Sequence, residues 1–261
     1  MDIKNDLSRI SLLVITLNEE ESIARCIGSA SGAGEIIVVD SFSDDRTVEI
    51  ARGMGATVYR RRYHSAADQK NWGMEKTSGE WVLILDADES VSPELGRSIA
   101  AAVASPDADG YWLRRRNEFF GRRIRFCGWG NDRVLRLFRR GTGWYPERAV
   151  HERLELNGAT GTLAGYLDHR PYRDMEDYID RMKSYTKRGA EDLKREGRGW
   201  FPAVVTHPLA RFLRMYIFQL GFLDGLPGFM LCAMAAMSVF FKYARLRELS
   251  SAHAGQPGDD R

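Results

Sequence analysis

Four short apolar runs in the first ninety residues constrain the fold more than any other feature of this sequence. Each run is rich in aliphatic and β-branched residues and is bounded by polar or turn-forming residues. Such runs are typical of strands that are buried on both faces of a sheet. The four predicted strands are SLLVITL (11–17), EIIVVD (35–40), ATVYRR (56–61) and WVLILD (81–86).

Helix start signals lie between these runs. Asn18 stands three residues before Glu21, which is a capping-box pattern. Asp44 and Asp45 precede RTVEIARGMG, a segment that has a helical pattern and ends in glycines. Because strands that alternate with helices favour a parallel sheet, the sequence predicts an α/β fold with a mostly parallel sheet flanked by helices.

The pattern changes further along the chain. SPELGRSIAAAVAS (92–105) predicts a helix with Ser92 as its N-cap and Pro93 at its first position. From residue 109 onwards, strand-like runs rich in arginine and separated by glycines predict an antiparallel extension of the sheet. Residues 175–197 have the spacing of an amphipathic helix.

Polar side chains stand where three of the predicted strands end, at Thr16 and Asn18, at Asp40, and at Asp86 and Asp88. Ligands of open α/β sheets bind outside the carboxyl ends of the strands, so these ends are expected to meet at one crevice. An Asp-x-Asp pair there supplies the oxygen ligands that Mg²⁺ or Mn²⁺ prefers, and the cation in turn neutralises a diphosphate. The alternative is that Asp86 caps the following loop while Asp88 is solvated.

Charge and cysteine content narrow the possible function classes. Lys and Arg number 38 and Asp and Glu 36, so a net charge of +2 excludes a general polyanion binder. Cys26, Cys127 and Cys232 lack the spacing of a zinc site or a disulfide framework, which fits a reducing compartment. The first ten residues include acidic ones and no apolar core, so no signal peptide is expected and the main domain is predicted to be cytosolic.

The C-terminal part of the chain is strongly apolar. From residue 215 to 241 the only charged residue is Asp224, and the longest charge-free run is Gly225–Phe241. That run is somewhat shorter than the ~20 residues of a membrane-spanning helix. A re-entrant or interfacial membrane element, flanked by Arg211 and Arg214, is the prediction.

Several motifs occur together in an order and spacing that resemble the inverting glycosyltransferases of family two, which have the GT-A nucleotide-sugar fold. The resemblance covers most of the chain and is strongest over residues 10–90. The later segments RVLRLFRRG, VHERL and GFLDGLPGF resemble the subgroup of lipopolysaccharide or lipooligosaccharide core β-1,4-glucosyltransferases. The four motifs that carry the family resemblance are VITLNEEESI, EIIVVDSFSDDRT, QKNWGMEKTSGEWVLILDADE and AVHERLELNG.

The resemblance implies roles for residues on the donor side of the site. It implies that the strand-end residues line a nucleotide pocket, that a polar cluster approaches the donor sugar or its phosphates, and that the last aspartate binds the metal. Ser43 is also explained as a helix N-cap, and Lys70 as an exposed helix residue. The implied pocket residues are Thr16, Asn18 and Glu20, with Asp40 at the uracil or ribose and Ser43 and Asp45 nearby. The implied polar cluster is Gln69, Lys70 and Asn71. Asp86 is implied to touch the ribose or donor sugar, and Asp88 to bind the metal.

Direct displacement at the anomeric carbon also needs a base that takes the proton from the acceptor hydroxyl. In WYPERAVHERL the candidates are Glu147 and Glu152, and the resemblance favours Glu152. His151 is implied as a third metal contact or diphosphate partner, although such a histidine is often only part of the hydrogen-bonded structure. Asp132 is a further candidate for the base.

Ten arginines lie between Arg114 and Arg140, close to several aromatic residues. One interpretation is that many of these arginines lie on a solvated strand face. The nearby aromatics, such as Trp112, Phe119 and Trp129, favour instead a surface on which arginines contact phosphates or anionic lipid and aromatic rings stack on sugars. No RNA- or DNA-binding signature accompanies these charges, so no nucleic-acid partner is expected. The preferred partner is a phosphorylated glycolipid acceptor.

These observations predict an enzyme that uses a UDP-sugar, with UDP-glucose expected, and a divalent metal to extend a lipid-linked glycan at the cytoplasmic face of a bacterial inner membrane. Alternatives left open are transfer to a polyprenyl phosphate or an exopolysaccharide, and a membrane-peripheral module that binds nucleotide or glycolipid without transfer. A nicotinamide dehydrogenase is disfavoured because TLNEEES stands where its glycine-rich turn belongs. The predicted parts are a GT-A domain (1–170), an amphipathic helix (171–200), an apolar membrane-associating segment (201–248) and a disordered tail (249–261).

Overall fold

The structure is a computed structural model, and it describes residues 7–146 and 153–254. Its residue contacts divide the chain into two compact units. The first unit comprises residues up to Arg116 together with Asn131–His169, and the second comprises Asn117–Gly130 together with the residues from Arg170 onwards. Each unit has a hydrophobic core of its own residues, so the two are described separately.

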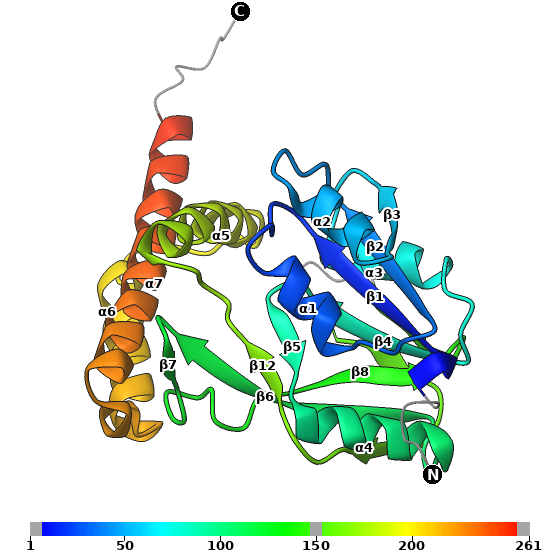
Figure 1. The fold of residues 1–261 in the computed structure, drawn as a ribbon. Coiled ribbons are helices and arrows are strands. Elements are labelled where there is room, and N and C mark those ends of the chain that lie inside the picture. Colours follow the sequence, from blue (N-terminus) through cyan, green and yellow to red (C-terminus); the bar gives the residue numbers. More distant parts are fainter. Residues whose placement is uncertain (1–6, 147–152, 255–261) are drawn as a thin grey trace, which may run out of the picture. The chain divides into compact units, whose positions relative to one another are not determined.

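The first unit is built on a sheet whose first four strands are parallel (Figure 1). In spatial order these strands are β3 (Thr57–Arg60), β2 (Glu35–Asp40), β1 (Ile10–Thr16) and β4 (Trp81–Asp86). The predicted parallel sheet is therefore confirmed, with strand bounds within one residue of those expected. The register sets Thr16 opposite Asp40 and Ile15 opposite Asp86, so the polar strand ends lie at one edge.

Antiparallel strands extend this sheet, as the arginine-rich pattern predicted. β8 (Arg133–Arg139) pairs antiparallel with β4, and β6 (Gly110–Phe119) pairs antiparallel with β8. β12 (Leu167–His169) and β5 (Glu89–Val91) follow at the far edge. The short elements are η2 (Leu7–Arg9), β7 (Arg122–Arg123), β9 (Gly143–Trp144), β10 (Glu155–Leu156) and β11 (Thr160–Thr162).

Helices cover both faces of the parallel strands, because alternate side chains of each strand are apolar on both sides. Leu12 and Val14 of β1 share one core cluster with residues of three helices, whereas Leu13 belongs to a second cluster with α3. The helices of the first cluster are α1 (Ile23–Ser29), α2 (Thr47–Gly53) and α4 (Pro93–Ala104), and α3 is Ala66–Met74. The parallel strands are thus held rigidly from both sides.

One predicted helix start is confirmed and another is wrong. Ser92 caps α4, because its Oγ accepts a hydrogen bond of 3.3 Å from the Leu95 amide. The capping box at Asn18 does not form: α1 begins at Ile23, and Asn18 has a φ of 54°. Its side-chain oxygen instead accepts a 3.0 Å hydrogen bond from the amide of Asp44, which joins two loops.

The second unit is helical, with α5 (Met175–Arg195) starting behind the N-cap Asp174 as an amphipathic helix, as predicted. α6 (Ala203–Leu213) continues through the π-helical turn η3 (Arg214–Phe218), and η4 (Gly221–Asp224) leads into α7 (Gly225–Ala254). Within the described residues, Gly221–Ser251 is the one helical stretch that is long and apolar enough to cross a membrane. α7 continues well past Phe241, where the charge-free run ends.

Candidate active site at the strand ends

The loops that follow β1 and β2 are joined to each other by side-chain to backbone hydrogen bonds. The Asn18 amide donates to Ser43 Oγ at 2.9 Å, and the Glu20 amide donates to Asp45 Oδ2 at 3.1 Å. The Asp44 amide donates back to the Asn18 side chain. These bonds bring predicted residues of the two loops together and hold the backbones of the loops against each other.

Asp40 is the last residue of β2 and is fully buried. Its carboxylate accepts bonds from the amide and the hydroxyl of Ser43, and its Oδ2 lies 3.6 Å from Arg60 Nε. Thr16, across the ladder, accepts a 2.9 Å bond at its carbonyl from the Ser41 amide, so it too supports this loop.

Asp45 holds the start of α2. Its carboxylate accepts hydrogen bonds from the amide and the hydroxyl of Thr47, the first residue of α2, whereas the N-cap position is Arg46, whose side chain makes no capping bond. Burial acts to raise the pKa of Asp45, but the bonds from Thr47 and from the Glu20 amide lower it below its usual value. The carboxylate is therefore ionised at neutral pH.

The polar cluster of α3 divides into two structural residues and one that reaches the strand end. Gln69 is buried and donates to Ser41 Oγ at 2.9 Å, and Asn71 exchanges bonds of 2.7 and 2.9 Å with the backbone of Tyr145. Lys70 Nζ lies 3.0 Å from Asp86 Oδ1. Because Lys70 is 6% exposed, the alternative that it is an exposed helix residue is wrong.

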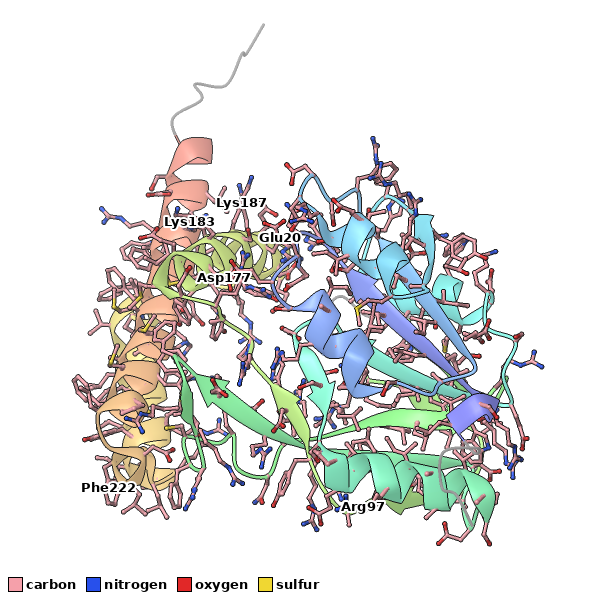
Figure 2. The ribbon with its side chains drawn as sticks, in the orientation of Figure 1. Glu20, Arg97, Asp177, Lys183, Lys187 and Phe222 are labelled. Carbon is pink, nitrogen blue, oxygen red and sulfur yellow. The ribbon has the colours of Figure 1, made fainter. Side chains whose placement is uncertain are left out.

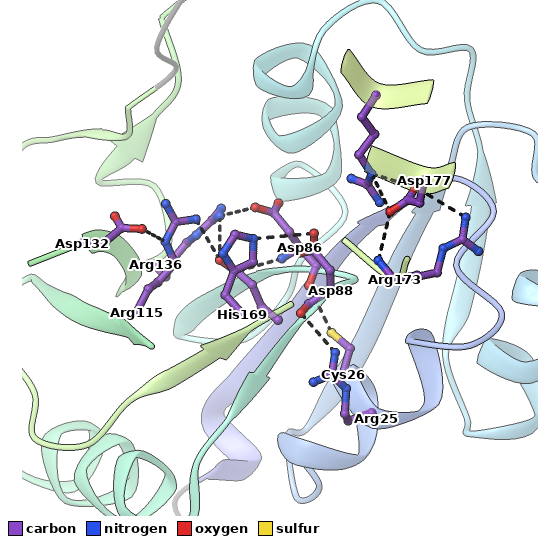
Figure 3. Close-up of polar contacts among 12 residues, drawn as sticks. Arg25, Cys26, Asp86, Asp88, Arg115, Asp132, Arg136, His169, Arg173 and Asp177 are labelled. Atoms are coloured by element: carbon purple, nitrogen blue, oxygen red, sulfur yellow. Dashed lines mark hydrogen bonds and ion pairs between the residues drawn. The ribbon is translucent and has the colours of Figure 1, made fainter. Parts of the chain in front are cut away.

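Asp86 is held by two cations, Lys70 and Arg136, and Figure 3 shows Asp86 with Arg136. Arg136, which is buried in β8, donates from Nη2 to Asp86 Oδ2, opposite the contact of Lys70 with Oδ1. Behind them Glu89 is fully buried: one oxygen accepts from the Asp86 amide at 2.9 Å, and the other lies 3.4 Å from both Arg136 and Arg115. The apolar strand β4 therefore ends in an ion-paired network.

Charge in this network determines the protonation of Asp86. Burial acts to raise the pKa of Asp86, but the charges of Arg136 and Lys70 hold it well below its usual range. The pKa of Arg136 is in turn raised well above its usual value, since burial is outweighed by Asp86 and Glu89. A depressed carboxyl pKa stabilises the fold above the unfolded value of about 3.9, and this stabilisation is lost as the pH falls below it.

Asp88 has the features of a metal ligand. Its side chain is 13% exposed, so the alternative that it is simply solvated is wrong. Its Oδ1 is buried and has no hydrogen-bond partner among the described residues, and its Oδ2 lies 3.6 Å from His169 Nε2 (Figure 3). An unsatisfied carboxylate oxygen beside an imidazole nitrogen suits a divalent cation.

The metal site is incomplete within residues 7–146 and 153–254, which contain no group of three or more His, Cys, Asp and Glu side chains placed to hold an ion. The predicted contact His151 and both candidate bases, Glu147 and Glu152, lie outside the described residues. The further candidate Asp132 is described, and its Oδ2 accepts a 2.8 Å bond from Arg115 Nε.

Sequence reasoning missed Arg136 and His169. Arg136 is one of the ten arginines between Arg114 and Arg140, and its burial on β8 distinguishes it from the exposed Arg133 and the half-buried Arg139 of the same strand. His169 is far along the chain from Asp88, and no local motif links the two.

The arginines of the predicted surface are divided between the two units. Arg122, Arg123 and Arg125 belong to the second unit, and several arginines of the first unit are in ion pairs. Phe119, one of the aromatics expected to stack on sugars, is buried in the core of the second unit.

Comparison with known proteins decides the family. The sequence model of glycosyl transferase family 2 matches residues 11–169, which include the parallel strands, Asp86, Asp88 and His169. The chain belongs to glycosyl transferase family 2. The resemblance seen in the sequence motifs is thereby confirmed, and the mostly parallel sheet with its flanking helices is GT-A-like.

Relatives of this family 2 glycosyltransferase match nearly its whole length. A glycosyltransferase of Rickettsia typhi is 28% identical over 94% of this chain and 88% of its own. The lipopolysaccharide core biosynthesis glycosyltransferase LpsC of Rhizobium meliloti is 28% identical over 96% of both chains. Among solved structures, S. aureus TarS 1–349 in complex with UDP-GlcNAc is 15% identical, with a TM-score of 0.49, over 95% of this chain and 92% of its own.

Proposed function

We propose that this glycosyltransferase moves a sugar, with glucose expected, from a UDP-sugar to a lipid-linked saccharide such as the lipopolysaccharide core, with inversion at the anomeric carbon. The observation that carries the proposal is a shared location. Asp86, Asp88 and the hydrogen-bonded loops after β1 and β2 lie at one edge of a rigid parallel sheet. The match to LpsC over 96% of both chains supports the class of acceptor.

The donor nucleotide is assigned to the crevice formed by the β1 and β2 loops. Thr16 ends β1, and Asn18 and Glu20 lie on the loop that follows. Asp40, at the end of β2, is the carboxylate proposed to accept from base N–H groups or ribose hydroxyls, although it is fully buried and already accepts bonds from Ser43. Asp86, held by Lys70 and Arg136, faces the ribose or the donor sugar in this proposal. Its two ion pairs keep it ionised and oriented before the donor arrives.

Mg²⁺ or Mn²⁺ is assigned to Asp88 and His169, with His151 as the further ligand that the sequence predicts. When bound, such an ion supplies electrostatic stabilisation of the charge that builds on the leaving diphosphate. This chain contributes Asp88 Oδ1, a buried carboxylate oxygen with no hydrogen-bond partner among the described residues. The other oxygen of Asp88 lies beside the imidazole of His169.

Removal of the proton from the acceptor hydroxyl is assigned to a glutamate of the segment WYPERAVHERL, with Glu152 preferred over Glu147. An ionised carboxylate within hydrogen-bond reach of that hydroxyl removes its proton as the hydroxyl oxygen attacks the anomeric carbon. Attack from the side opposite the leaving diphosphate inverts the configuration, so a single displacement suffices.

Replacing Asp88 with Ala is expected to lower sugar transfer by about 10²–10³-fold, because a preorganised group at the leaving diphosphate is lost. The assay is incorporation of label from radioactive UDP-glucose, with Mn²⁺, into lipopolysaccharide with a truncated core. Asp180→Ala, at an exposed site on α5, is the control and should keep wild-type activity. A folded Asp88→Ala variant with full activity would refute this assignment.

We also propose that the second unit attaches the enzyme to the inner membrane. The turn between α6 and α7 carries large exposed apolar side chains, including Phe218 (80% exposed) and Leu226 (69% exposed), and Figure 2 shows Phe222 at this turn. Only 17% of the apolar stretch of α7 is buried, whereas the core helix of a soluble protein is mostly buried. Exposed apolar surface of this extent marks an interaction site.

The double variant Phe218→Glu/Leu226→Glu is expected to bind vesicles of anionic phospholipid at least about 10²-fold more weakly than the wild type, because two large apolar contacts with lipid are lost. Vesicle flotation measures the partitioning. Ser31→Glu/Ala101→Glu makes the same charge change at exposed sites of the first unit and should leave binding unchanged. Equal binding by both double variants would contradict attachment through this turn.

A further inference from the structure

A cavity of about 340 Å³ adjoins Asp86 within the first unit. Its size falls in the range of small-molecule sites, which is about 300–1,000 Å³. It shares Asp86 and Lys70 with the donor-side residues, but no residue of the β1 and β2 loops lines it. The cavity therefore adjoins the end of β4 and is separate from the β1 and β2 loops proposed to hold the nucleotide, so it is available to the acceptor in the proposed function.

The described residues that line the cavity carry an excess of positive charge. They include five cations and two carboxylates, Asp86 and Asp132. These two carboxylates, with the buried Glu89 behind them, are the ion-pair partners of Lys70, Arg115 and Arg136. The other two cations are arginines, and no carboxylate among the described residues of the cavity lining balances their positive charges.

These two arginines are Arg133 and Arg153, and both are exposed. Neither has a carboxylate partner among residues 7–146 and 153–254. The guanidinium of Arg133 lies 5.3 Å from the centre of the Trp112 ring, an aromatic residue that also lines the cavity. A guanidinium stacked on an aromatic ring retains its in-plane N–H donors, which match the geometry of a phosphate or carboxylate.

We propose that Arg133 and Arg153 bind an anionic substituent, a phosphate monoester or a carboxylate, on the acceptor saccharide. The sugar ring then lies in the cavity, which Trp112 and Tyr145 also line. This inference rests on the proposed function and specifies its acceptor as an acidic saccharide.

The test is calorimetric titration of the full chain with glucose 6-phosphate, glucuronate and glucose, each with and without saturating UDP. Saturation with UDP fills the donor crevice, so that binding of an anionic sugar in its presence reports a second site. Binding of glucose 6-phosphate but not glucose is expected, and binding of glucuronate as well would show that a carboxylate also suffices. Equal affinity for glucose and glucose 6-phosphate, or no binding of either anionic sugar, would overturn the proposal.

Variants assign the binding to the two arginines. Arg133→Gln/Arg153→Gln is expected to lower the affinity for the anionic sugar at least about tenfold and to leave UDP affinity unchanged. Arg52→Gln/Arg97→Gln removes the same charge from exposed sites on α2 and α4 and should change neither affinity. Unchanged sugar affinity in the first variant, or loss of UDP affinity instead, would overturn the assignment.

Failure of the inference is distinguishable from failure of the proposed function. The wild-type protein is titrated with UDP alone in the same series, so UDP binding without anionic-sugar binding would overturn only the acceptor subsite. Anionic-sugar binding without UDP binding would overturn the proposed donor and leave the subsite standing.

Discussion

Replacing Arg136 with Met is expected to lower the free energy of unfolding at pH 7 by about 3–5 kcal/mol, measured by urea denaturation. Arg136 is 5% exposed and pairs with Asp86, while the buried Glu89 lies 3.4 Å from the same Nη2 atom. Met fills a similar volume but carries no charge. The variant therefore leaves the carboxylates of Asp86 and Glu89 with one positive charge fewer at the end of β4. The loss of this charge determines the size of the effect.

The pH dependence of this variant distinguishes charge from packing. Without Arg136 the pKa of Asp86 rises in the folded state, so the carboxylate accepts a proton more readily and its destabilising charge is removed as the pH falls. The difference from wild type should shrink between pH 7 and pH 4. Arg52→Met, at an exposed position on α2, should stay within about 0.5 kcal/mol of wild type. A pH-independent loss would mean that packing, and not charge, is responsible.

Replacing Glu152 with Gln is expected to lower kcat by about 10²–10⁴-fold while leaving the affinity for the UDP-sugar unchanged. Glutamine retains the shape of the side chain but cannot accept the proton of the acceptor hydroxyl. Steady-state transfer at saturating UDP-glucose gives kcat, and calorimetry with UDP gives donor affinity.

Glu147→Gln is the matched control, since it lies in the same segment and undergoes the same change. It should retain kcat within a few-fold of wild type. If Glu147→Gln loses turnover and Glu152→Gln retains it, the base is Glu147. If both retain it, Asp132 becomes the candidate, although its carboxylate is paired with Arg115.

The sequence predicted the parallel sheet well because the signals were local. Each of the first four strands is a short, largely apolar run, and the central strands β1 and β4 are buried on both faces. Asp86 and Asp88 could be placed for the same reason, because their position follows directly from where β4 ends. The helix behind Ser92 was equally local, since one hydroxyl and one proline specify its start.

The features that sequence reasoning missed depend on long-range contacts. Asn18 carries a capping-box signal, but its amide group bonds to Asp44 of another loop, and this tertiary contact prevails over the local preference. Arg136 resembles its neighbours on β8 until the partner strand β4 brings Asp86 beside it. His169 lies close to Asp88 only because β12 pairs with β5, and no sequence motif predicts this pairing.

The measurement that tests the central claim most directly is calorimetric titration of the purified protein with UDP, UDP-glucose, GDP and NAD, each with and without Mn²⁺. UDP and UDP-glucose should bind in a manganese-dependent way, GDP and NAD should not, and Asp88→Ala should lose the manganese dependence while it remains folded. Absence of UDP binding under every condition, or binding of GDP or NAD in its place, would contradict the proposed UDP-sugar donor.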